Sequence, residues 1–217
     1  NGFNLIQSLA KGGLGNAWGA GAAPYTVKEL EHIGLPPLEM QKSYITISKR
    51  IGLSGCYDDA DIFFNKKNLK LDSPLEIDPV LFNVYNSYRK SKKVLNSKGV
   101  YFGRTPLAVI SESKRNRHPY NYRNMDFYDD AGGSVYRPWM TLDQLDNSSL
   151  FSYISNAFVL EFSEKIGLNE VIYKDLKSGD NKKVKCRKLL LGAGVTSSAR
   201  IILRSFKSKE ELPILTN

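Results

Sequence analysis

The feature that most constrains the fold of this chain is a glycine-dense segment near its N-terminus. Five of the ten residues from Gly12 to Gly21 are glycine, in the sequence GGLGNAWGAG. Glycine loses the most backbone entropy on folding and is a poor helix former, so neither a stable helix nor a packed strand is expected here. The segment is predicted to be a loop that needs positive φ angles or a close approach of its backbone to another group.

Helical patterns follow this loop through the first two thirds of the chain. Thr26 with Glu29 forms a capping box, which predicts a short helix ending near Gly34. Apolar spacing predicts a second helix over residues 38–51 and a third that begins at Asp78-Pro79 and ends before Gly99. A second capping-box spacing predicts a short helix from Thr141 through Leu145. Short strands are expected at residues 62–64, 100–102 and 107–110.

The last third of the chain has the pattern of a strand meander followed by a helix. Short strands are expected at residues 151–154, 158–162, 171–175 and 183–187, with a turn at 178–181. The apolar run at 189–191 is predicted to be a buried strand. Gly192-Ala193-Gly194 would then form a tight turn into a helix over residues 195–206.

Composition limits the class of protein. The chain has 217 residues, 41% of them hydrophobic, and a net charge of +9, so it can bury a core and favours an acidic partner. Cys56 and Cys186 fit neither a disulfide framework nor a structural zinc site, which favours a reducing, cytoplasmic location. No apolar run approaches the ~20 residues of a membrane span. The chain begins without Met, as expected for a segment of a longer protein.

Two glycine-rich elements could contact a ligand. The loop at 12–21 offers backbone N–H groups unobstructed by side chains, which suits a phosphate or a planar heterocycle. The alternative is an ordered connector without a ligand. The strand, glycine turn and helix at 189–206 would place free amides and the positive end of the helix dipole at an anion. The alternative here is plain packing of a helix on a sheet.

Catalytic side chains are scarce. His32 and His118 lie in contexts typical of structural or exposed histidines. The acidic clusters at 58–61 and 126–130 lack calcium-loop spacing, so they are interpreted as solvated loops and no metal site is expected. The stretch 114–123 combines basic residues with two tyrosines, which could bind a nucleotide or single-stranded nucleic acid. No recognised nucleic-acid motif accompanies it, so nucleic acid is not the favoured partner.

Taken together, the two glycine elements resemble the pattern of one family. KGGLGNAWGAGAAPYT, at residues 11–26, is similar to the flavin-proximal loop of glucose–methanol–choline (GMC) oxidoreductases, particularly the bacterial branch associated with polysaccharide and lipopolysaccharide biosynthesis. GVYFGRTPLAV, at 99–109, is similar to a later family segment. The stretch 158–205 resembles the return of the chain to the FAD-binding domain of the family. The order and separation of these segments carry the resemblance.

The resemblance implies FAD as the cofactor. Residues of the first loop would lie against the isoalloxazine and neighbouring parts of FAD, and Asn16 could hydrogen-bond a flavin heteroatom. Those loop residues are Gly12, Gly13, Gly15, Asn16, Ala17, Trp18 and Gly19. Val159 would approach the adenine through backbone contacts. Gly192, Ala193 and Gly194 would pass close to the ribose or diphosphate.

The activity implied is oxidation of an alcohol, on a sugar or polysaccharide precursor, by hydride transfer to the flavin. Two parts of the family pattern are missing from this sequence: the N-terminal diphosphate fingerprint and the C-terminal segment with the catalytic histidine. We therefore name no catalytic base. The chain is expected to be an internal fragment that is inactive alone and binds FAD weakly or undetectably. An anionic-ligand module that uses residues 114–123 and an inactive descendant of the oxidoreductase are the alternatives.

The predicted fold class is α+β. A mainly antiparallel sheet would carry helices on one face, beside a β-meander and a strand–Gly-Ala-Gly–helix unit of an FAD-binding domain. Three segments are predicted: a flavin-proximal loop and helix at 1–35, a substrate or cap-like region at 36–150, and the meander with its helix at 151–217. Exposed sheet edges would favour homo-oligomers.

Overall fold

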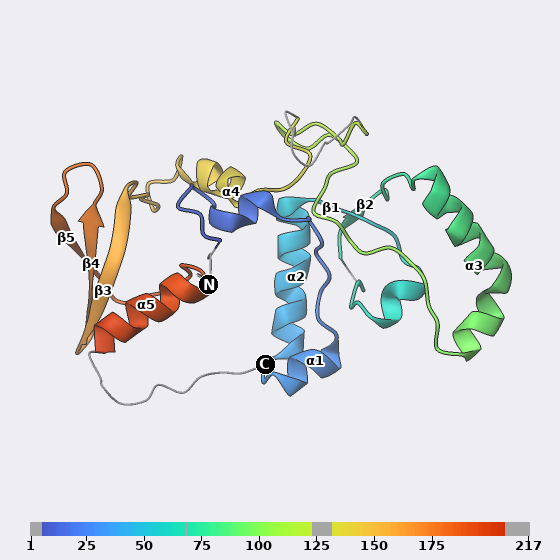
Figure 1. Cartoon of the computed structure of the whole chain (residues 1–217), viewed down its shortest axis with the longest axis horizontal. Coiled ribbons are helices and arrows are strands. Elements are labelled where there is room, and N and C mark those ends of the chain that lie inside the picture. The colour runs from blue at the N-terminus through green and yellow to red at the C-terminus, as the bar shows by residue number, and fades with distance from the viewer. Residues whose placement is uncertain (1–5, 68, 123–131, 207–217) are drawn as a thin grey trace, which may run out of the picture. The chain divides into compact units, whose positions relative to one another are not determined.

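The computed structural model describes residues 6–67, 69–122 and 132–206. Among these residues are five α-helices, a two-stranded parallel sheet and a three-stranded antiparallel sheet, which confirms the α+β class (Figure 1). Ser8–Gln144 form one compact unit, and residues 6–7 together with 145–206 belong to a second. We call them the N-terminal unit and the C-terminal unit and describe each by itself. No helix in the described ranges has both the length and the apolar character that a membrane span requires.

The helices of the N-terminal unit begin where the sequence supplies caps. They are α1 (Val27–His32), α2 (Pro37–Ile51), α3 (Pro79–Ser97) and α4 (Pro138–Leu145). The capping box before α1 is confirmed: Glu29 N donates to Thr26 Oγ1 over 3.3 Å, and Thr26 N donates to Glu29 Oε2 over 2.7 Å. Asp78 Oδ1 caps α3 by accepting from Val80 N.

The second capping-box prediction is wrong. Thr141 lies inside α4, which already begins at Pro138. Proline at the first helical position has a fixed φ that suits a helix and no N–H to satisfy, so it starts the helix earlier than the threonine. The Thr141 hydroxyl instead lies 2.8 Å from the hydroxyl of Tyr136.

The strands of the N-terminal unit are shorter than expected and lie elsewhere. β1 (Leu53–Ser54) pairs in parallel with β2 (Leu71–Asp72). The strand predictions for 62–64 and 100–102 are wrong, and 107–110 contributes only isolated bridges, from Leu107 and Val109. Ile62 instead ends the 3-10 helix η2 (Asp59–Ile62), which Asp58 caps. A side-chain cap thus overrode local strand propensity.

The core of the N-terminal unit joins these bridges to the end of α2. Its buried members come from five separate stretches of the chain: Ala20, Ile51, Leu53, Leu69, Ala108, Val109 and Val135. Gly52 ends α2 with φ 76°, and a Cβ there would lie 2.5 Å from the Ile110 side chain. Glycine is therefore needed at position 52 both for the turn and for the close packing.

The C-terminal unit is a three-stranded meander with one helix. β3 (Ala157–Lys165), β4 (Leu168–Asp175) and β5 (Asn181–Cys186) pair antiparallel in the order β3-β4-β5. The helix α5 (Val195–Phe206) packs on β3. Phe162 N donates to Ser205 Oγ over 2.8 Å, and the Phe162 and Phe206 rings meet edge to face. Ile201 of α5 is buried, so α5 covers one face of the meander.

Two strand predictions for this unit are wrong. Residues 151–154 and 189–191 have no strand assignment. Leu190 is 95% exposed, and no described segment pairs with its backbone. An apolar run forms a strand only where a neighbour supplies hydrogen bonds, and the meander does not extend that far. The predicted strand–Gly-Ala-Gly–helix unit is thus present as an extended segment, a turn and a helix.

The turn between β4 and β5 is held by one carboxylate, which predicts a pH dependence. Lys182 Nζ lies 2.6 Å from Asp175 Oδ2, and Lys177 N donates to Asp175 Oδ1 over 2.9 Å. These contacts lower the pKa of Asp175 to about 2. Because the ionised carboxylate makes these contacts, they stabilise the turn fully above pH ~4. This stabilisation is lost as the pH falls from ~4 through 2 and the carboxylate takes up a proton. A carboxyl-carbon NMR titration should give a midpoint near 2, and Asp175→Asn should flatten this part of the stability curve. A midpoint near 4 would contradict the assignment.

Candidate functional site

The glycine-dense loop of the N-terminal unit contains one tight turn of 3-10 helix. This element, η1, spans Gly13–Ala17, so the expectation of no helical structure is wrong for these residues. Gly12 has φ 96° and Gly13 has φ 61°. These two positive φ angles confirm the predicted need for glycine at the start of the loop. A 3-10 helix of five residues has few i to i+3 hydrogen bonds, so a glycine-rich segment can form it where a longer helix would be unstable.

Asn16 orders this loop from inside. Its Nδ2 donates to Lys11 O over 2.8 Å, and its backbone carbonyl accepts from Arg137. Asn16 Oδ1 is buried and has no hydrogen-bond partner in the described ranges. A Cβ on Gly12 would lie 2.4 Å from that oxygen, so glycine at 12 makes room for the amide. A flavin heteroatom could reach Oδ1 only if the loop opened.

The remaining loop residues divide into an inward and an outward set. Trp18 Nε1 donates to Tyr136 O over 2.7 Å, and the indole packs on the core of the unit. Ala17 and Gly19 are exposed. No atom lies within 4 Å of a Cβ built on Gly13 or Gly19. The loop backbone is therefore open at Gly13 and Gly19, whereas the Leu14 side chain between Gly13 and Gly15 is 49% exposed.

The loop glycines differ in the effect expected from alanine. A Cβ on Gly15 would lie 2.7 Å from Pro138 Cγ, so Gly15→Ala should lower the free energy of unfolding by about 1–3 kcal/mol through overpacking. Gly19 has open space and no positive φ, so Gly19→Ala should be neutral or stabilising by up to about 1 kcal/mol. Urea denaturation of the two variants checks this. Equal losses at both positions would contradict the predicted role of Pro138.

A pocket of the C-terminal unit brings together three residues that the sequence singled out separately. Val159 on β3 and Gly192-Ala193 before α5 line one cavity of about 230 Å³. The rest of its lining is apolar: Phe162, Val171, Leu189, Leu190, Leu191 and Ile201. Ligand pockets range from roughly 300 to 1,000 Å³, so this cavity could hold a single heterocycle.

The turn into α5 is ordered by its own helix. Gly194 has φ 80° and its carbonyl accepts from Ser198 N. Ala193 N donates to Ser198 Oγ over 3.2 Å. That amide is engaged within the protein, so an anion at this turn would meet other backbone N–H groups of the first helical turn. The seven loop residues and the four C-terminal residues belong to different units.

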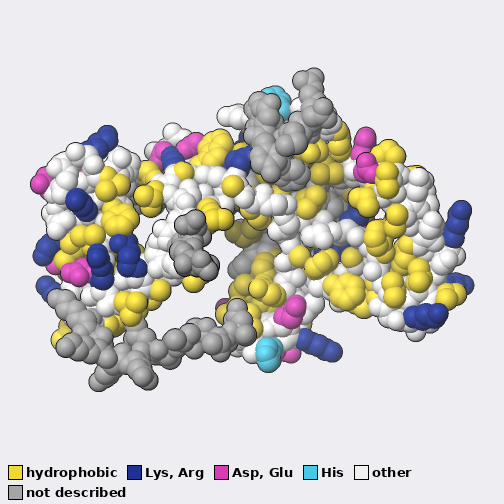
Figure 2. Space-filling view, in the orientation of Figure 1, with side chains coloured by type: hydrophobic (Ala, Val, Ile, Leu, Met, Phe, Trp, Pro, Cys, Tyr) yellow, Lys and Arg dark blue, Asp and Glu magenta, His cyan; other side chains and the backbone are white. Residues whose placement is uncertain are grey.

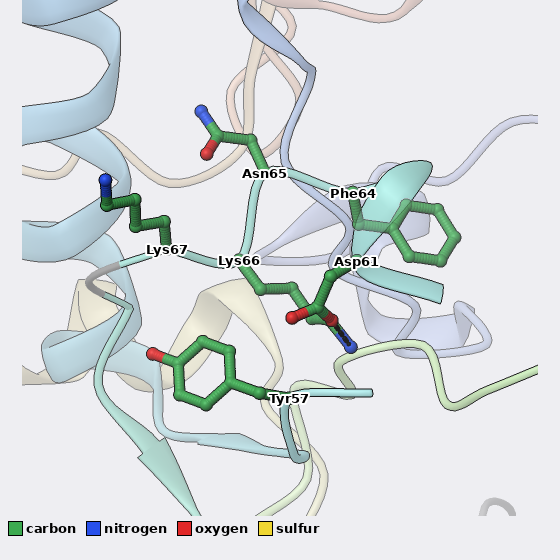
Figure 3. Close-up of a pocket in the computed structure, with 6 residues that line it drawn as sticks. All are labelled: Tyr57, Asp61, Phe64, Asn65, Lys66 and Lys67. Atoms are coloured by element: carbon green, nitrogen blue, oxygen red, sulfur yellow. Dashed lines mark ion pairs between the residues drawn. The ribbon is translucent and has the colours of Figure 1, made fainter. Parts of the chain in front are cut away.

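A buried lysine beside a second pocket is the charged centre that sequence reasoning missed. The pocket, about 310 Å³, is lined by Tyr57, Asp61, Phe64, Asn65, Lys66 and Lys67 (Figure 3). Lys66 is 1% exposed; its Nζ lies 2.5 Å from Asp61 Oδ1 and 3.1 Å from Asp58 Oδ1, and it donates to Cys56 O over 2.8 Å. Burial lowers the pKa of Lys66, but hydrogen bonds to Asp61 and Asp58 outweigh it and raise the pKa above its usual value.

These contacts make the Lys66 centre structural. In Figure 3, Lys66 and Asp61 point toward each other, whereas Asn65 and Lys67 point away from the pair. The Lys66 ammonium is fully engaged by protein acceptors and is not offered to a ligand. The interpretation of 58–61 as a solvated acidic loop is therefore wrong. The signal available was a capping box, Asp58 with Asp61, followed closely by a lysine.

The third carboxylate of the same cluster is also paired. Asp59 Oδ1 lies 2.6 Å from Lys92 Nζ, and Asp59 Oδ2 accepts from the Tyr88 hydroxyl over 2.5 Å. Lys92 and then Tyr88 lower the pKa of Asp59. In the described ranges, no three His, Cys, Asp or Glu side chains could hold a metal ion together. Burial raises the pKa of the Cys56 thiol, which disfavours a nucleophilic thiolate.

The basic stretch is tied to the N-terminal unit by its own side chains. Lys114 Nζ lies 2.7 Å from Asp72 Oδ2, and Arg115 donates to Gln144 over 3.0 Å. Arg117 donates to the backbone carbonyls of Ile51, Gly133 and Ser134. Arg123 and the acidic cluster at 126–130 lie outside the described residues. His32 and His118 are both exposed, in agreement with the sequence interpretation.

No protein-family model matches this chain, and no curated protein matches it. The GMC resemblance therefore stays a prediction carried by the quoted segments. The geometry adds two features to it: a glycine loop whose backbone is open at Gly13 and Gly19, and an apolar pocket that joins Val159 to Gly192-Ala193.

Proposed function

We propose that this chain is part of a GMC-type, FAD-dependent oxidoreductase that oxidises an alcohol group of a sugar or polysaccharide precursor in the cytoplasm. One observation supports this most strongly. The resemblance assigned both Val159 and the Gly192-Ala193 turn to FAD contacts, and both line one pocket of the C-terminal unit. Val159 and the Gly192-Ala193 turn are separated in the sequence by β4 and β5. They therefore meet in this pocket because of the fold and not because they are neighbours along the chain.

Several matched residues have roles under this proposal that agree with their surroundings. The backbone of Gly13 and Gly19 would lie under a planar ring, because neither carries a side chain on the open side of the loop. Trp18 and Asn16 would hold the loop in shape, through Tyr136 O and Lys11 O. The apolar wall beside Val159 would shelter the adenine. FAD, when bound, supplies the acceptor for the hydride of the alcohol.

The proposal is tested by flavin content. The product of the complete reading frame should purify with flavin absorbance, and its alcohol-oxidising activity should require flavin. Ala193→Trp would fill the pocket and should cause loss of flavin, whereas Leu176→Trp, in the exposed β4–β5 turn, should retain it. A full-length product without flavin, or retention by both variants with native circular dichroism, would overturn the proposal.

A second expectation concerns the 217-residue chain alone. Among the residues that the structure describes, the C-terminal cavity of about 230 Å³ accommodates only part of a dinucleotide. We therefore expect weak or undetectable FAD binding and no turnover. A stoichiometric flavin spectrum from this chain would contradict that expectation while leaving the parent activity intact.

Homo-oligomer formation through sheet edges is the remaining part of the proposal. β3 and β5 are the edge strands of the meander. Lys182, Lys183 and Lys185 are exposed on β5, which opposes strand addition there, so pairing would involve β3. Light scattering that gives the mass of one chain at high concentration would count against it.

A further inference from the structure

The α3 helix of the N-terminal unit has an unusual charge composition. Its 19 residues, PVLFNVYNSYRKSKKVLNS, include four basic residues and no acidic residue. The basic residues, Arg89, Lys90, Lys92 and Lys93, all lie in its C-terminal half and are exposed. A helix on an ordinary soluble surface usually mixes both signs of charge. The face that α3 presents therefore suits an anionic partner.

One side of α3 is fixed to its own unit. The Tyr85 and Tyr88 rings lie 6.0 and 5.7 Å from the Phe102 ring between centroids. Lys92 and Tyr88 hold Asp59, so Lys92 is committed to an internal ion pair. Figure 1 shows α3 as an outlying helix with the rest of its unit on one side only. The other side remains open to a partner.

The open side carries a stripe of valines. Val80, Val84 and Val94 are 70%, 50% and 59% exposed, and Ser87 and Ser91 continue their spacing. Residues three and four apart lie on one face of a helix, so these five positions share one face, on which Ser87 and Ser91 separate Val84 from Val94. Exposed single apolar residues are ordinary, but a row along one helix calls for an apolar neighbour.

Basic side chains border this stripe. Lys90 lies one helical turn before Val94, whereas Arg89 and Lys93 lie farther around the helix from the valines. Figure 2 shows Lys and Arg side chains on the outer surface of α3, beside hydrophobic ones. Arg89, Lys90 and Lys93 have exposed side chains that can turn toward a common surface.

We propose that α3 is a peripheral membrane-binding helix that rests on an anionic lipid surface. Its valine stripe would enter the boundary between headgroups and acyl chains, and its basic rows would meet the lipid phosphates. An acidic polymer or nucleic acid would use the lysines and leave the valines in water, so the pairing of the two favours lipid. This inference is independent of the flavin proposal.

The test is co-sedimentation of the 217-residue chain with lipid vesicles. The chain should bind vesicles of phosphatidylcholine mixed with phosphatidylglycerol and not vesicles of phosphatidylcholine alone. Lys90→Glu/Lys93→Glu should weaken binding at least tenfold, since each basic residue at an anionic surface contributes a factor of about five. Lys177→Glu/Lys185→Glu, on exposed positions of the C-terminal unit, makes the same charge change and should have little effect.

Two further arms separate lipid from other anionic partners. Val80→Gln/Val84→Gln should weaken vesicle binding severalfold without changing binding to soluble poly-glutamate. Circular dichroism should show native helix content in every variant, because all the substituted side chains are exposed. The proposal would be overturned if the chain bound neutral vesicles equally well, bound poly-glutamate alone, or bound nothing. An equal loss of binding in both lysine variants would overturn it as well.

Discussion

Replacing Lys66 with methionine is expected to lower the free energy of unfolding by about 3–5 kcal/mol. Methionine matches the length of the buried stem but removes the ammonium that pairs Asp58 and Asp61. The Asp58 side chain is only 9% exposed, so its charge would remain buried without its cationic partner. Removing one partner of a buried ion pair is strongly destabilising, because the other charge stays buried without compensation. Replacing both partners by apolar residues has a much smaller effect on the free energy of unfolding. Urea denaturation followed by circular dichroism measures the loss.

The adjacent lysine is the matched control. Lys67 is exposed, and its backbone carbonyl accepts a hydrogen bond from Gln41 Nε2 over 3.0 Å. Lys67→Met should change the free energy of unfolding by no more than about 0.5 kcal/mol. A triple change that adds Asp58→Asn and Asp61→Asn to Lys66→Met should recover part of the loss, since no buried carboxylate is then left unpaired. Equal stability of the Lys66 and Lys67 variants would contradict the burial argument.

Replacing Arg117 with alanine is expected to cost about 3–5 kcal/mol, because one guanidinium joins three separate carbonyls. Arg117 Nε donates to Gly133 O over 2.7 Å, Nη1 donates to Ile51 O over 2.5 Å, and Nη2 donates to Ser134 O over 2.8 Å. Hydrogen bonds to a charged group contribute about 1.5–3 kcal/mol each, with incomplete additivity. Arg117 thereby fixes the end of α2 to the segment around Gly133.

Two variants sharpen this prediction. Arg117→Lys keeps the charge but lacks the planar fork, so it should recover less than half of the loss. Arg115→Ala removes a single hydrogen bond from an exposed residue, to Gln144, and should cost less than about 1 kcal/mol. Thermal unfolding of the four proteins compares them directly. A loss at Arg115 as large as that at Arg117 would contradict the role given to the three carbonyls.

The contacts of Arg117 also bear on the alternative function. An anionic-ligand module at 114–123 needs its basic side chains available, but Lys114 and Arg117 serve the fold. Loss of ligand binding on Arg117→Ala would therefore reflect unfolding unless stability were measured in parallel. Basic residues in a loop do not by themselves indicate a binding surface, because they can donate to carbonyls that have no backbone partner at the ends of helices and strands.

The helices were predictable from sequence because their signals are local. The Thr26 capping box, Asp78-Pro79 and the terminal Gly52 each act within one turn of the residue that supplies them. The β3–β4–β5 meander was also predictable, since alternating residues and the turn at Gly179 lie close in sequence. Both kinds of signal are read within a short window of the chain.

The failures share a dependence on distant partners. The strand predictions at 62–64, 100–102 and 189–191 rested on apolar runs, and a run becomes a strand only if another segment offers its backbone. The buried centre at Lys66 depends on carbonyls of Cys56 and Arg104, which no short window contains. The pocket that joins Val159 to Gly192 was implied only through the family resemblance.

The burial of Lys66 also makes it a natural reporter of opening in the N-terminal unit. Its ammonium is enclosed by Asp58, Asp61 and two backbone carbonyls, so in the closed form it cannot lose its proton and attack an amine-reactive label. Surface lysines such as Lys67 would be labelled at once, whereas the rate at Lys66 would follow the frequency of opening. Mass spectrometry of the labelled chain would thus measure how often the N-terminal unit opens around Lys66, without any probe being engineered into it.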